Sequence, residues 1–556
     1  MKIKSIYFEN YKAFKTGKVQ LTPLSVLLGT NSSGKSSIIK LILMLSQTLV
    51  GRKNTHLLTE GKFADLGELE NLFWNQDTNK VLKFEFNIES LELDTILDQS
   101  AIAIKALITM LVRDYYDEYR FVEGEVDLDL RTEVYDLGRS NRNLYNSNPT
   151  LEEKLHSAEL ALKVLKKINK KSALIDKPIN NNVLFEDETK ENEVISPLLL
   201  KHTIDFIRDL QALGEINKFG YNFRFYKDKL IIDSVYFGSE KKQTSISFWN
   251  HKYKRKHLQI NSNVFNTKKL DHYKSNFDCK LDRLTFSWAN SMNSNIRSMR
   301  DRKLLQKNGP AFILFHVLKE VFNKNINTLN PSNIKYVSPL RFYPKRYFLV
   351  EGGESDSFWD TFNGERLSAI LNDNPELRDQ INKWFKKFDL EIDVEKLKGM
   401  IHSIKVKDRG LTLDITDVGF GVSQILPVIL QPYLSNDSGL TIIEQPEIHI
   451  HPKMQSELAD FFVSLINTSN KHFLIETHSE AFLKRMRRRI AENNDDLPDS
   501  ISNENVSIHF VEKGKNKKIP THIKDVEIEK NGFFEWPEDF RVNDIEDTIE
   551  FMKYQG

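Results

Sequence analysis

The sequence predicts an α/β fold: a mixed sheet with flanking helices, divided by a large, mainly helical insertion. Three observations predict it. A glycine-rich loop at 29–37 stands between two apolar runs. Short apolar runs return at 440–443 and 473–475, and each is followed by polar residues. Residues 91–333, between the loop and these runs, have a different and more helical pattern. Short apolar runs bounded by turn residues are typical of buried strands in a parallel sheet.

The loop reads Gly-Thr-Asn-Ser-Ser-Gly-Lys-Ser-Ser and lies between apolar runs at 24–28 and 38–45. Gly29 and Gly34 permit a tight turn in which successive backbone N–H groups face an anion. A helix that begins just after the loop adds positive potential at the same point. We therefore expect Lys35 to reach the β- and γ-phosphates of ATP and the Ser36 hydroxyl to bind Mg²⁺. The other loop residues expected to contact the nucleotide are Asn31, Ser32, Ser33 and Ser37.

Composition restricts the class of protein. The 556 residues are 40% hydrophobic, which is enough for several folded domains with real cores. The net charge of +1 argues against a chain that is basic throughout and binds nucleic acid with its whole surface. A single cysteine excludes a disulfide framework and suits a reducing compartment. Neither a signal peptide nor a run long enough to span a bilayer is present, so we expect a cytoplasmic protein.

The changes of pattern along the chain suggest a split domain. We expect an N-lobe at 1–90, an insertion at 91–333 that is rich in helix, and a C-lobe at 334–556. Within the insertion, the alternation of apolar residues predicts a hairpin over 219–235 and a strand over 123–132. No internal repeat and no sustained heptads are found.

Three further motifs follow in the C-lobe. A buried strand that ends in Glu444 can hold Mg²⁺ beside the nucleotide. A second strand leads to His478, which can place an imidazole near the γ-phosphate. The turn Gly-Phe-Gly-Val-Ser-Gln at 419–424 supplies small residues and a hydroxyl ahead of a helix, which is another anion-binding arrangement.

This set of motifs resembles the ABC-type ATPase heads of SMC-like and OLD-like proteins, which dimerise around ATP. The loop at 29–37 resembles their Walker A motif, residues 442–446 their Walker B motif, and residues 10–14 their N-terminal motif, which places Lys12 among the expected nucleotide contacts. The resemblance implies that His478 is the switch histidine. It also implies that the segment at 419–424 is the signature that contacts ATP bound to the partner subunit, through Gly421, Ser423 and Gln424. For Ser423 and Gln424, simple helix capping is the alternative.

One departure from the family pattern has a chemical consequence. Such heads usually carry Asp-Glu-Pro, whereas this chain has Glu444, Gln445 and Pro446. Glu444 can still serve Mg²⁺, but an amide such as Gln445 is not a general base near neutral pH. We therefore expect slow hydrolysis and a long-lived ATP-bound dimer. Glu447 is the alternative base, although a loop or interface role is favoured for it.

Several other segments leave two interpretations open. His449 and His451, with Glu447 nearby, could bind a metal or form a structural turn before Pro452. The segment 336–348, with two prolines and three cations between aromatics, resembles the Pro-Leu-Arg loop of related ATPases near the nucleotide, but it could also be a charge-paired surface turn. The basic, aromatic-rich segment 241–283 predicts nucleic-acid binding or a solvated loop with core aromatics. The basic run at 484–489 could bind nucleic acid or pair with acidic residues at 492–499.

The sequence after His478 contains no clustered nuclease carboxylates and no HNH-like pattern, so we expect a separate effector. The motif set, the length and the segment at 531–537 resemble the PtuA subunits of Septu-type antiphage defence, including the retron-associated form. The resemblance implies an ATP-held homodimer or higher oligomer that restrains or positions a separate HNH nuclease of the PtuB type. In the retron form, the basic segment 241–283 would hold an RNA–DNA hybrid.

Two other classes remain open at this point. One is an SMC-like ATPase of DNA repair or chromosome organisation, which the Glu-Gln-Pro motif and the missing heptads disfavour. The other is the ATPase partner of a small toxin in a PARIS-like system, in which the ATPase likewise serves as a scaffold for an effector. The genes that neighbour this one would separate the three classes.

Overall fold

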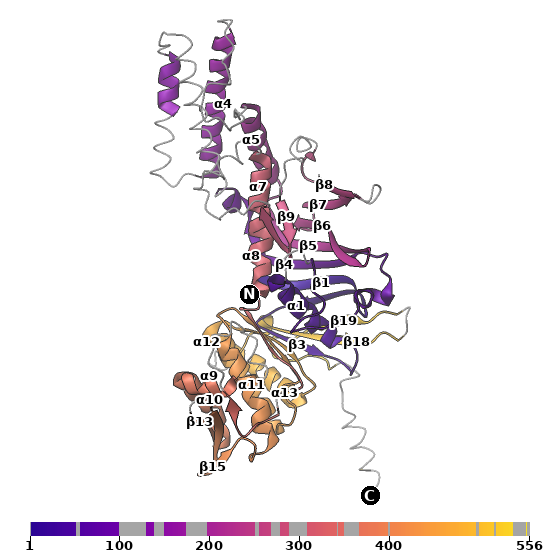
Figure 1. Cartoon of the computed structure of the whole chain (residues 1–556), viewed down its shortest axis with the longest axis vertical. Helices are drawn as coiled ribbons and strands as arrows, with labels where there is room; N and C mark the ends of the chain where they lie inside the picture. Colours follow the sequence, from indigo (N-terminus) through magenta and orange to yellow (C-terminus); the bar gives the residue numbers. More distant parts are fainter. Residues whose placement is uncertain are drawn as a thin grey trace. The chain divides into compact units, whose positions relative to one another are not determined.

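The structure is a computed structural model that describes most of the chain (Figure 1). The chain folds into two compact units. The first unit comprises 1–87, 224–230 and 327–556, and the second comprises 88–223 and 231–326. The short segment 224–230, which the sequence placed inside the insertion, therefore belongs to the first unit. The described residues are 2–51, 56–98, 129–137, 150–173, 197–250, 255–267, 279–288, 309–341, 343–349, 366–398, 401–495, 500–515, 519–536 and 552.

A six-stranded sheet of the first unit carries the predicted motifs. Its strand order is β11-β16-β17-β3-β18-β19, and only β19 runs antiparallel to its neighbour. Every residue of β3, β16 and β17 is buried, which explains why these strands read as continuous apolar runs. The strands are β3 Leu24–Leu28, β11 Ile334–Val337, β16 Leu440–Glu444, β17 His472–Glu476, β18 Val506–Glu512 and β19 His522–Val526.

Helices follow the strands of this sheet, as the sequence predicts. The apolar residues of the α-helices that lie between residues 367 and 491 share one buried cluster with strands β3, β16, β17 and β18. Gly34 precedes α1, and Ser479 caps α13 by accepting a hydrogen bond from the Phe482 N–H at 3.0 Å. The helices are α1 Lys35–Val50, α9 Leu367–Asp373, α10 Pro375–Phe385, α11 Phe420–Leu434, α12 Pro452–Ser469 and α13 Glu480–Ala491.

The first unit also contains a four-stranded antiparallel sheet. It contains β12 Phe348–Leu349, β13 Leu390–Lys398, β14 Ile401–Asp408 and β15 Leu411–Asp414. Ile392, Ile404 and Val406 of this sheet belong to the same buried cluster as the helices, so the sheet is anchored by apolar packing.

A third, seven-stranded sheet has the order β2-β1-β4-β5-β6-β7-β8. Apolar residues of β4 alternate with half-buried polar ones, which is the pattern of a strand with one covered face. The predicted hairpin over 219–235 is confirmed by β5 and β6. The strands are β1 Ile3–Tyr11, β2 Phe14–Gln20, β4 Leu82–Glu92, β5 Glu215–Tyr226, β6 Lys229–Gly238, β7 Gln243–Asn250 and β8 Arg255–Ser262.

The second unit combines helices with strands in its described residues. Its described residues contain much of β4 to β6, all of β7 and β8, and the hairpin of β9 Cys279–Asp282 and β10 Thr285–Trp288. Phe322 lies 5.1 Å from both Phe219 and Phe286, ring centroid to ring centroid, in an aromatic core. The helices include α4 Leu151–Ala173, α5 Pro197–Gln211 and α7 Gly309–Leu318, which a π-helical turn at Lys319–Asn323 and α8 Lys324–Ile326 follow.

The strand expected over 123–132 is wrong for its described end. Residues 129–137 form a helix, and 123–128 lie outside the described residues. A short alternation of apolar and acidic residues fits one helical turn as well as a strand, so it decides little by itself. The α/β fold class with an inserted unit is confirmed.

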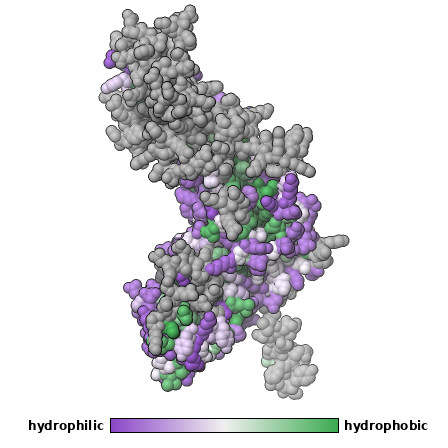
Figure 2. All heavy atoms as spheres, in the orientation of Figure 1, coloured by the Kyte–Doolittle hydropathy of each residue, from purple (hydrophilic) through white to green (hydrophobic). Residues whose placement is uncertain are grey.

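No helix within the described ranges is both long enough and apolar enough to cross a bilayer. Figure 2 shows that the described surface on this face is mostly hydrophilic, with separate hydrophobic patches.

Candidate nucleotide site

The loop between β3 and α1 has the backbone that the sequence predicts. Gly29 has φ +144° and Gly34 has φ +112°, a region that L side chains avoid. A Cβ on Gly29 would lie 2.4 Å from the Val511 carbonyl oxygen, so only glycine fits there. The N-terminal motif packs under the loop: the Phe14 ring lies where a Cβ on Gly34 would point, at 3.0 Å, and the Tyr11 hydroxyl donates to the Ser37 carbonyl at 3.0 Å.

Lys35 begins α1 and is turned back onto its own loop. Its side chain is 3% exposed, and Nζ donates to the carbonyls of Gly29 at 2.9 Å and Thr30 at 3.0 Å. The same Nζ lies 3.6 Å from Oε1 of Glu476. Burial lowers the pKa of Lys35, and the Glu476 carboxylate opposes that shift. The ammonium is thus held where a phosphate-binding loop needs it, with protein oxygens as its partners.

The remaining loop residues differ in exposure. Asn31, Ser32 and Ser36 are exposed, and Ser37 is half-buried. Ser33 is buried, and its hydroxyl has no hydrogen-bond partner in the described part of the chain. The exposed Ser36 hydroxyl at the start of α1 is accessible to a ligand, as its predicted role requires.

The end of β16 holds a buried carboxylate. Glu444 is 6% exposed and its Oε1 accepts a hydrogen bond from the Tyr336 hydroxyl at 2.5 Å. Gln445 follows with φ +46°, and its N–H donates to the Glu476 carbonyl at 2.7 Å. This bond ties the turn after β16 to the end of the neighbouring strand.

Arg341, from the Pro-Leu-Arg segment, supports the same turn. Its Nη2 donates to the carbonyls of Glu444 at 3.1 Å and Gln445 at 2.8 Å. Burial lowers the pKa of Arg341 to about 10, and its Nε and Nη1 have no hydrogen-bond partner among the described residues. Arg341 does not fit a charge-paired surface turn, because its guanidinium bonds to backbone carbonyls. Arg346, in the same segment 336–348, is exposed and pairs with Asp414 and Asp417, as that interpretation expects. Contact of this segment with nucleotide stays a prediction.

The end of β17 lies beside that of β16, with Glu476 in register with Glu444. Glu476 is 5% exposed, and burial together with the Glu444 charge raises its pKa to about 7. Its Oε2 is buried and has no hydrogen-bond partner in the described residues. The sequence analysis missed Glu476, although the glutamate directly before Thr477 and His478 ends an apolar run in the same way as Glu444.

Glu447 links the turns that follow the two strands. Its Oε1 accepts from the His478 N–H at 2.7 Å and its Oε2 from the Thr477 hydroxyl at 2.8 Å. Burial raises the pKa of Glu447, and these hydrogen bonds oppose that shift. Both carboxylate oxygens of Glu447 therefore accept hydrogen bonds, as we expect for a residue that stabilises a loop. A role as general base stays a prediction and would require one of these bonds to open.

His478 presents a ring nitrogen without a partner. Its Nε2 is buried and makes no hydrogen bond in the described chain, and burial and the Lys35 charge lower its pKa. A neutral imidazole follows at pH 7. That is the state in which one ring nitrogen can donate to a phosphate oxygen.

The start of α11 corrects one expectation. The helix begins at Phe420, directly after Gly419, so the Ser423 hydroxyl lies in the first turn and not ahead of the helix. Ser423 is fully buried, its Oγ donates to the Phe420 carbonyl at 2.7 Å, and Gln424 is 3% exposed. A Cβ on Gly421 would lie 2.6 Å from the His449 carbonyl oxygen, so the turn at 447–450 packs closely against it. The exposed residues are Gly419 and Phe420, which the sequence analysis did not select.

Lys12 has its own partners. Its Nζ donates to the Leu66 carbonyl at 2.8 Å, and burial lowers its pKa. These bonds hold Lys12 against the segment that follows α1, and a nucleotide contact of Lys12 stays a prediction.

The donor set of the site suits Mg²⁺. Mg²⁺ prefers oxygen ligands and usually takes one or two carboxylates besides phosphate and water. Ser36 offers an exposed hydroxyl. Glu444 and Glu476 end neighbouring strands in register, and Oε2 of Glu476 has no hydrogen-bond partner among the described residues. By contrast, the described residues contain no group of three or more His, Cys, Asp or Glu that could hold a metal ion. His451 instead caps α12, accepting from the Lys453 N–H at 3.2 Å, so the turn interpretation applies to it.

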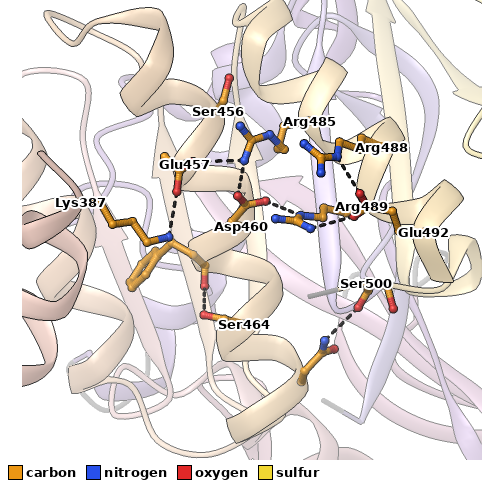
Figure 3. A network of polar contacts seen from close by, with 12 residues as sticks. Lys387, Ser456, Glu457, Asp460, Ser464, Arg485, Arg488, Arg489, Glu492 and Ser500 are labelled. Carbon is orange, nitrogen blue, oxygen red and sulfur yellow. Dashed lines mark hydrogen bonds and ion pairs between the residues drawn. The ribbon is translucent and has the colours of Figure 1, made fainter. Parts of the chain in front are cut away.

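Arg485, Arg488 and Arg489 of the basic run at 484–489 form ion pairs within their own unit (Figure 3). Arg485 pairs with Glu457 and Asp460, and Arg489 pairs with Asp460 and Glu492. Arg488 also pairs with Glu492, and Lys484 with Glu480. These contacts favour the ion-pairing interpretation of the run, with partners on α12 as well as after α13.

The other basic segment, 241–283, is partly outside the described residues. Its described part forms the β7–β8 hairpin and β9. Phe248 lies 6.4 Å from Phe286, and Phe265 lies 6.0 Å from Phe206, ring centroid to ring centroid. These two aromatics therefore pack within the unit. Tyr253, Tyr273 and Phe277 are not described, and nucleic-acid binding by this segment stays a prediction.

A family model described as AAA ATPase domain matches residues 1–483 of the chain. A comparison with curated proteins gave no significant match. Among solved structures, the SMC head domain from Thermotoga maritima is similar at 8% identity and a TM-score of 0.31, covering 95% of this chain and 100% of that one.

Two further SMC heads are similar at 8% identity each. One is bound to the C-winged helix domain of ScpA, with a TM-score of 0.34 and coverage of 95% of this chain and 99% of that one. The other, derived from Pyrococcus furiosus, has an extended coiled coil and is bound to the C-terminal domain of ScpA. Its TM-score is 0.30, and the coverage is 100% of this chain and 99% of that one.

Proposed function

This chain belongs to the AAA ATPase domain family, and we propose that it is an ATP-binding, slowly hydrolysing subunit that dimerises around ATP and controls a separate nuclease. The observation that supports ATP binding most strongly is the convergence of Lys35, Glu444, Glu476 and His478 at one edge of the sheet. Lys35 reaches Glu476, and Glu476 lies in register with Glu444. Burial of these charged groups without a ligand is costly, which is typical of a site built for one.

In the proposed complex, the loop at 29–37 binds the phosphates through its backbone N–H groups and Lys35. Ser36 and Glu444 would hold Mg²⁺, whose charge would offset that of the phosphates. His478 would donate a hydrogen bond from its unpartnered ring nitrogen to the γ-phosphate. Ser36, Glu444 and His478 are positioned by the fold before nucleotide arrives, which lowers the cost of ordering on binding, whereas Lys35 has to leave part of its present contacts.

Slow hydrolysis follows from Gln445. Its amide can orient a water molecule by donating a hydrogen bond, but it does not accept the proton that attack on phosphorus releases. Glu447 carries a carboxylate, yet both of its oxygens accept hydrogen bonds from the turn after β17. ATP would therefore persist in the site and act mainly as a structural ligand.

Dimerisation around ATP is supported by the exposed start of α11. Gly419 has open space around its Cα, and Phe420 is 39% exposed although it is aromatic. The neighbouring Tyr343 is 77% exposed, and its ring centroid lies 5.8 Å from that of Phe420. An exposed helix start with an exposed aromatic edge suits contact with a phosphate and a protein surface of a second copy.

Control of a separate nuclease of the HNH, PtuB-like type rests on the motif resemblance to PtuA subunits of Septu and retron-Septu systems. In that scheme, the ATP-bound dimer or larger assembly restrains the nuclease in antiphage defence. Binding of a retron RNA–DNA hybrid would then involve the segment 241–283.

The test combines assembly state, turnover and partners. We expect a dimer by analytical ultracentrifugation with MgATP, a monomer without nucleotide, and a monomer for Lys35→Ala under both conditions. Turnover should stay well below about ten per second. Purification from the native operon, followed by mass spectrometry and nucleic-acid analysis, should recover a nuclease. A wild-type monomer at saturating MgATP rejects the dimer, turnover of tens per second or more rejects slow hydrolysis, and recovery of a toxin alone rejects the nuclease.

A further inference from the structure

Two buried glutamates end neighbouring parallel strands of the first unit. Glu444 closes β16 and Glu476 closes β17, and the strand register pairs them directly. Their side chains are 6% and 5% exposed, so water screens their charges poorly. Glu444 accepts a hydrogen bond from Tyr336, but the Oε2 of Glu476 is buried without any partner in the described residues. Two such carboxylates repel each other unless they share a proton or a positive charge lies with them.

Lys35 is the cation that lies with this pair. Its Nζ is 3.6 Å from Oε1 of Glu476, and it also donates to the carbonyls of Gly29 and Thr30. One ammonium group therefore serves a carboxylate and the backbone of its own loop. A lysine that binds the β- and γ-phosphates has to give up at least part of this arrangement.

We propose that Glu476 is a second carboxylate ligand for a divalent cation, beside Glu444 and Ser36, and that Lys35 covers it until nucleotide draws the lysine away. The proposal rests on the proposed ATP binding at the loop. Once Lys35 turns to phosphate, Glu476 has lost its counter-charge, and a divalent cation restores the balance. The open oxygen of Glu476 provides the coordination position that Mg²⁺ or Mn²⁺ prefers. Nucleotide and cation binding are thereby coupled through one side chain, in addition to their attraction for each other.

The first experiment measures metal and nucleotide separately. Mn²⁺ binding is followed by electron paramagnetic resonance with a non-hydrolysable ATP analogue present, and a fluorescent ATP analogue is titrated in EDTA. We expect Glu476→Gln to weaken Mn²⁺ binding to the nucleotide complex by about 10- to 100-fold. It should also strengthen metal-free nucleotide binding severalfold, because Lys35 is no longer held. A folding defect would weaken both, and Mn²⁺ affinity equal to that of wild type overturns the proposal.

The second experiment needs no nucleotide. Lys35→Ala should uncover the carboxylate pair, so that Mn²⁺ alone binds about tenfold tighter than it does to the wild-type protein. Adding Glu476→Gln to that variant should abolish the gain. Glu480→Gln, which changes a glutamate paired with Lys484 at 2.7 Å, is the matched control and should change neither measurement. Absence of any gain in Lys35→Ala overturns the proposal. Failure of the wild-type protein to bind nucleotide would instead reject the proposed function, and this arm would still test the carboxylate pair.

Discussion

The ends of β16 and β17 start from nearly the same sequence and become different chemical environments. Both strands have five buried residues and close with glutamate in matching register. Glu444 receives a phenol hydrogen bond from Tyr336, and Arg341 holds its carbonyl. Glu476 faces the ammonium of Lys35 and leaves one oxygen unpartnered. The role of each carboxylate is therefore set by what the neighbouring segments bring to it, and not by the strand that carries it.

The turns after the two strands differ as well, and Glu447 joins them. The turn after β16 contains an amide at 445 and supplies Glu447, while the turn after β17 supplies Thr477 and His478 as donors. A displacement of either turn would be transmitted to the other through these bonds. The two ends therefore act as one unit, which the following substitutions test.

Gln445→Glu changes the end of β16 most. A carboxylate at this position should supply the missing base and raise ATP turnover by about 100-fold. The measurement is phosphate release at saturating MgATP, with Gln445→Ala as the control that adds no carboxylate. Turnover that stays at the wild-type value would place the base elsewhere, and Glu447 would then be the next position to change.

Glu447→Gln tests the link between the two turns. The amide can accept only one of the two hydrogen bonds and has no charge, so the closed state should lose about 2 kcal/mol. The His478 amide should then exchange with deuterium about 30-fold faster, because local opening becomes more frequent. Hydrogen-exchange mass spectrometry of the peptide around 478 measures this. Equal exchange in Glu447→Gln and wild type would show that the bonds do not hold the turn.

Tyr336→Phe changes only the partner of Glu444. Loss of the hydroxyl should cost about 1.5 kcal/mol, since a buried carboxylate loses a donor. The thermal midpoint of the protein should fall by about 2 °C in a scan at fixed rate. Tyr343→Phe, at a residue that is 77% exposed, should leave the midpoint unchanged. If both variants shift the midpoint equally, the hydrogen bond to Glu444 contributes nothing specific.

Thr477→Val and Thr477→Ser test the contact between the turn after β17 and Glu447. Valine removes the hydroxyl that donates to Glu447 at 2.8 Å and accepts from the Ser479 N–H at 3.0 Å, whereas serine retains it. We expect a cost of about 1 kcal/mol for valine and close to none for serine. A double-mutant cycle with Glu447→Gln should give a coupling energy of about 1 kcal/mol, and strict additivity would contradict the contact.

Several elements of the site could be predicted from the sequence because local rules fix them. Positive φ at Gly29 and Gly34 follows from the steric freedom of glycine, and the apolar runs mark β3, β16 and β17 because a parallel strand is buried on both faces. The start of α1 after the loop and the turn before Pro452 follow from the same kind of rule. The position of Ser423 was missed because the helix start depends on how Gly421 packs against the turn at 447–450.

A phosphate-binding loop and two strand-end motifs in an α/β fold can be predicted from the sequence alone. Their residue types and spacings are local properties. The contacts of these residues could be seen only in the folded protein. Glu476 lies beside the Lys35 ammonium, and Tyr336 and Arg341 donate hydrogen bonds to Glu444. Glu447 accepts hydrogen bonds from the turn after β17. These partners lie up to hundreds of positions apart, and strand order and register alone bring them within hydrogen-bonding distance. The charge of a side chain follows from its residue type. The electrostatic potential at that side chain depends on the neighbours that the fold brings to it.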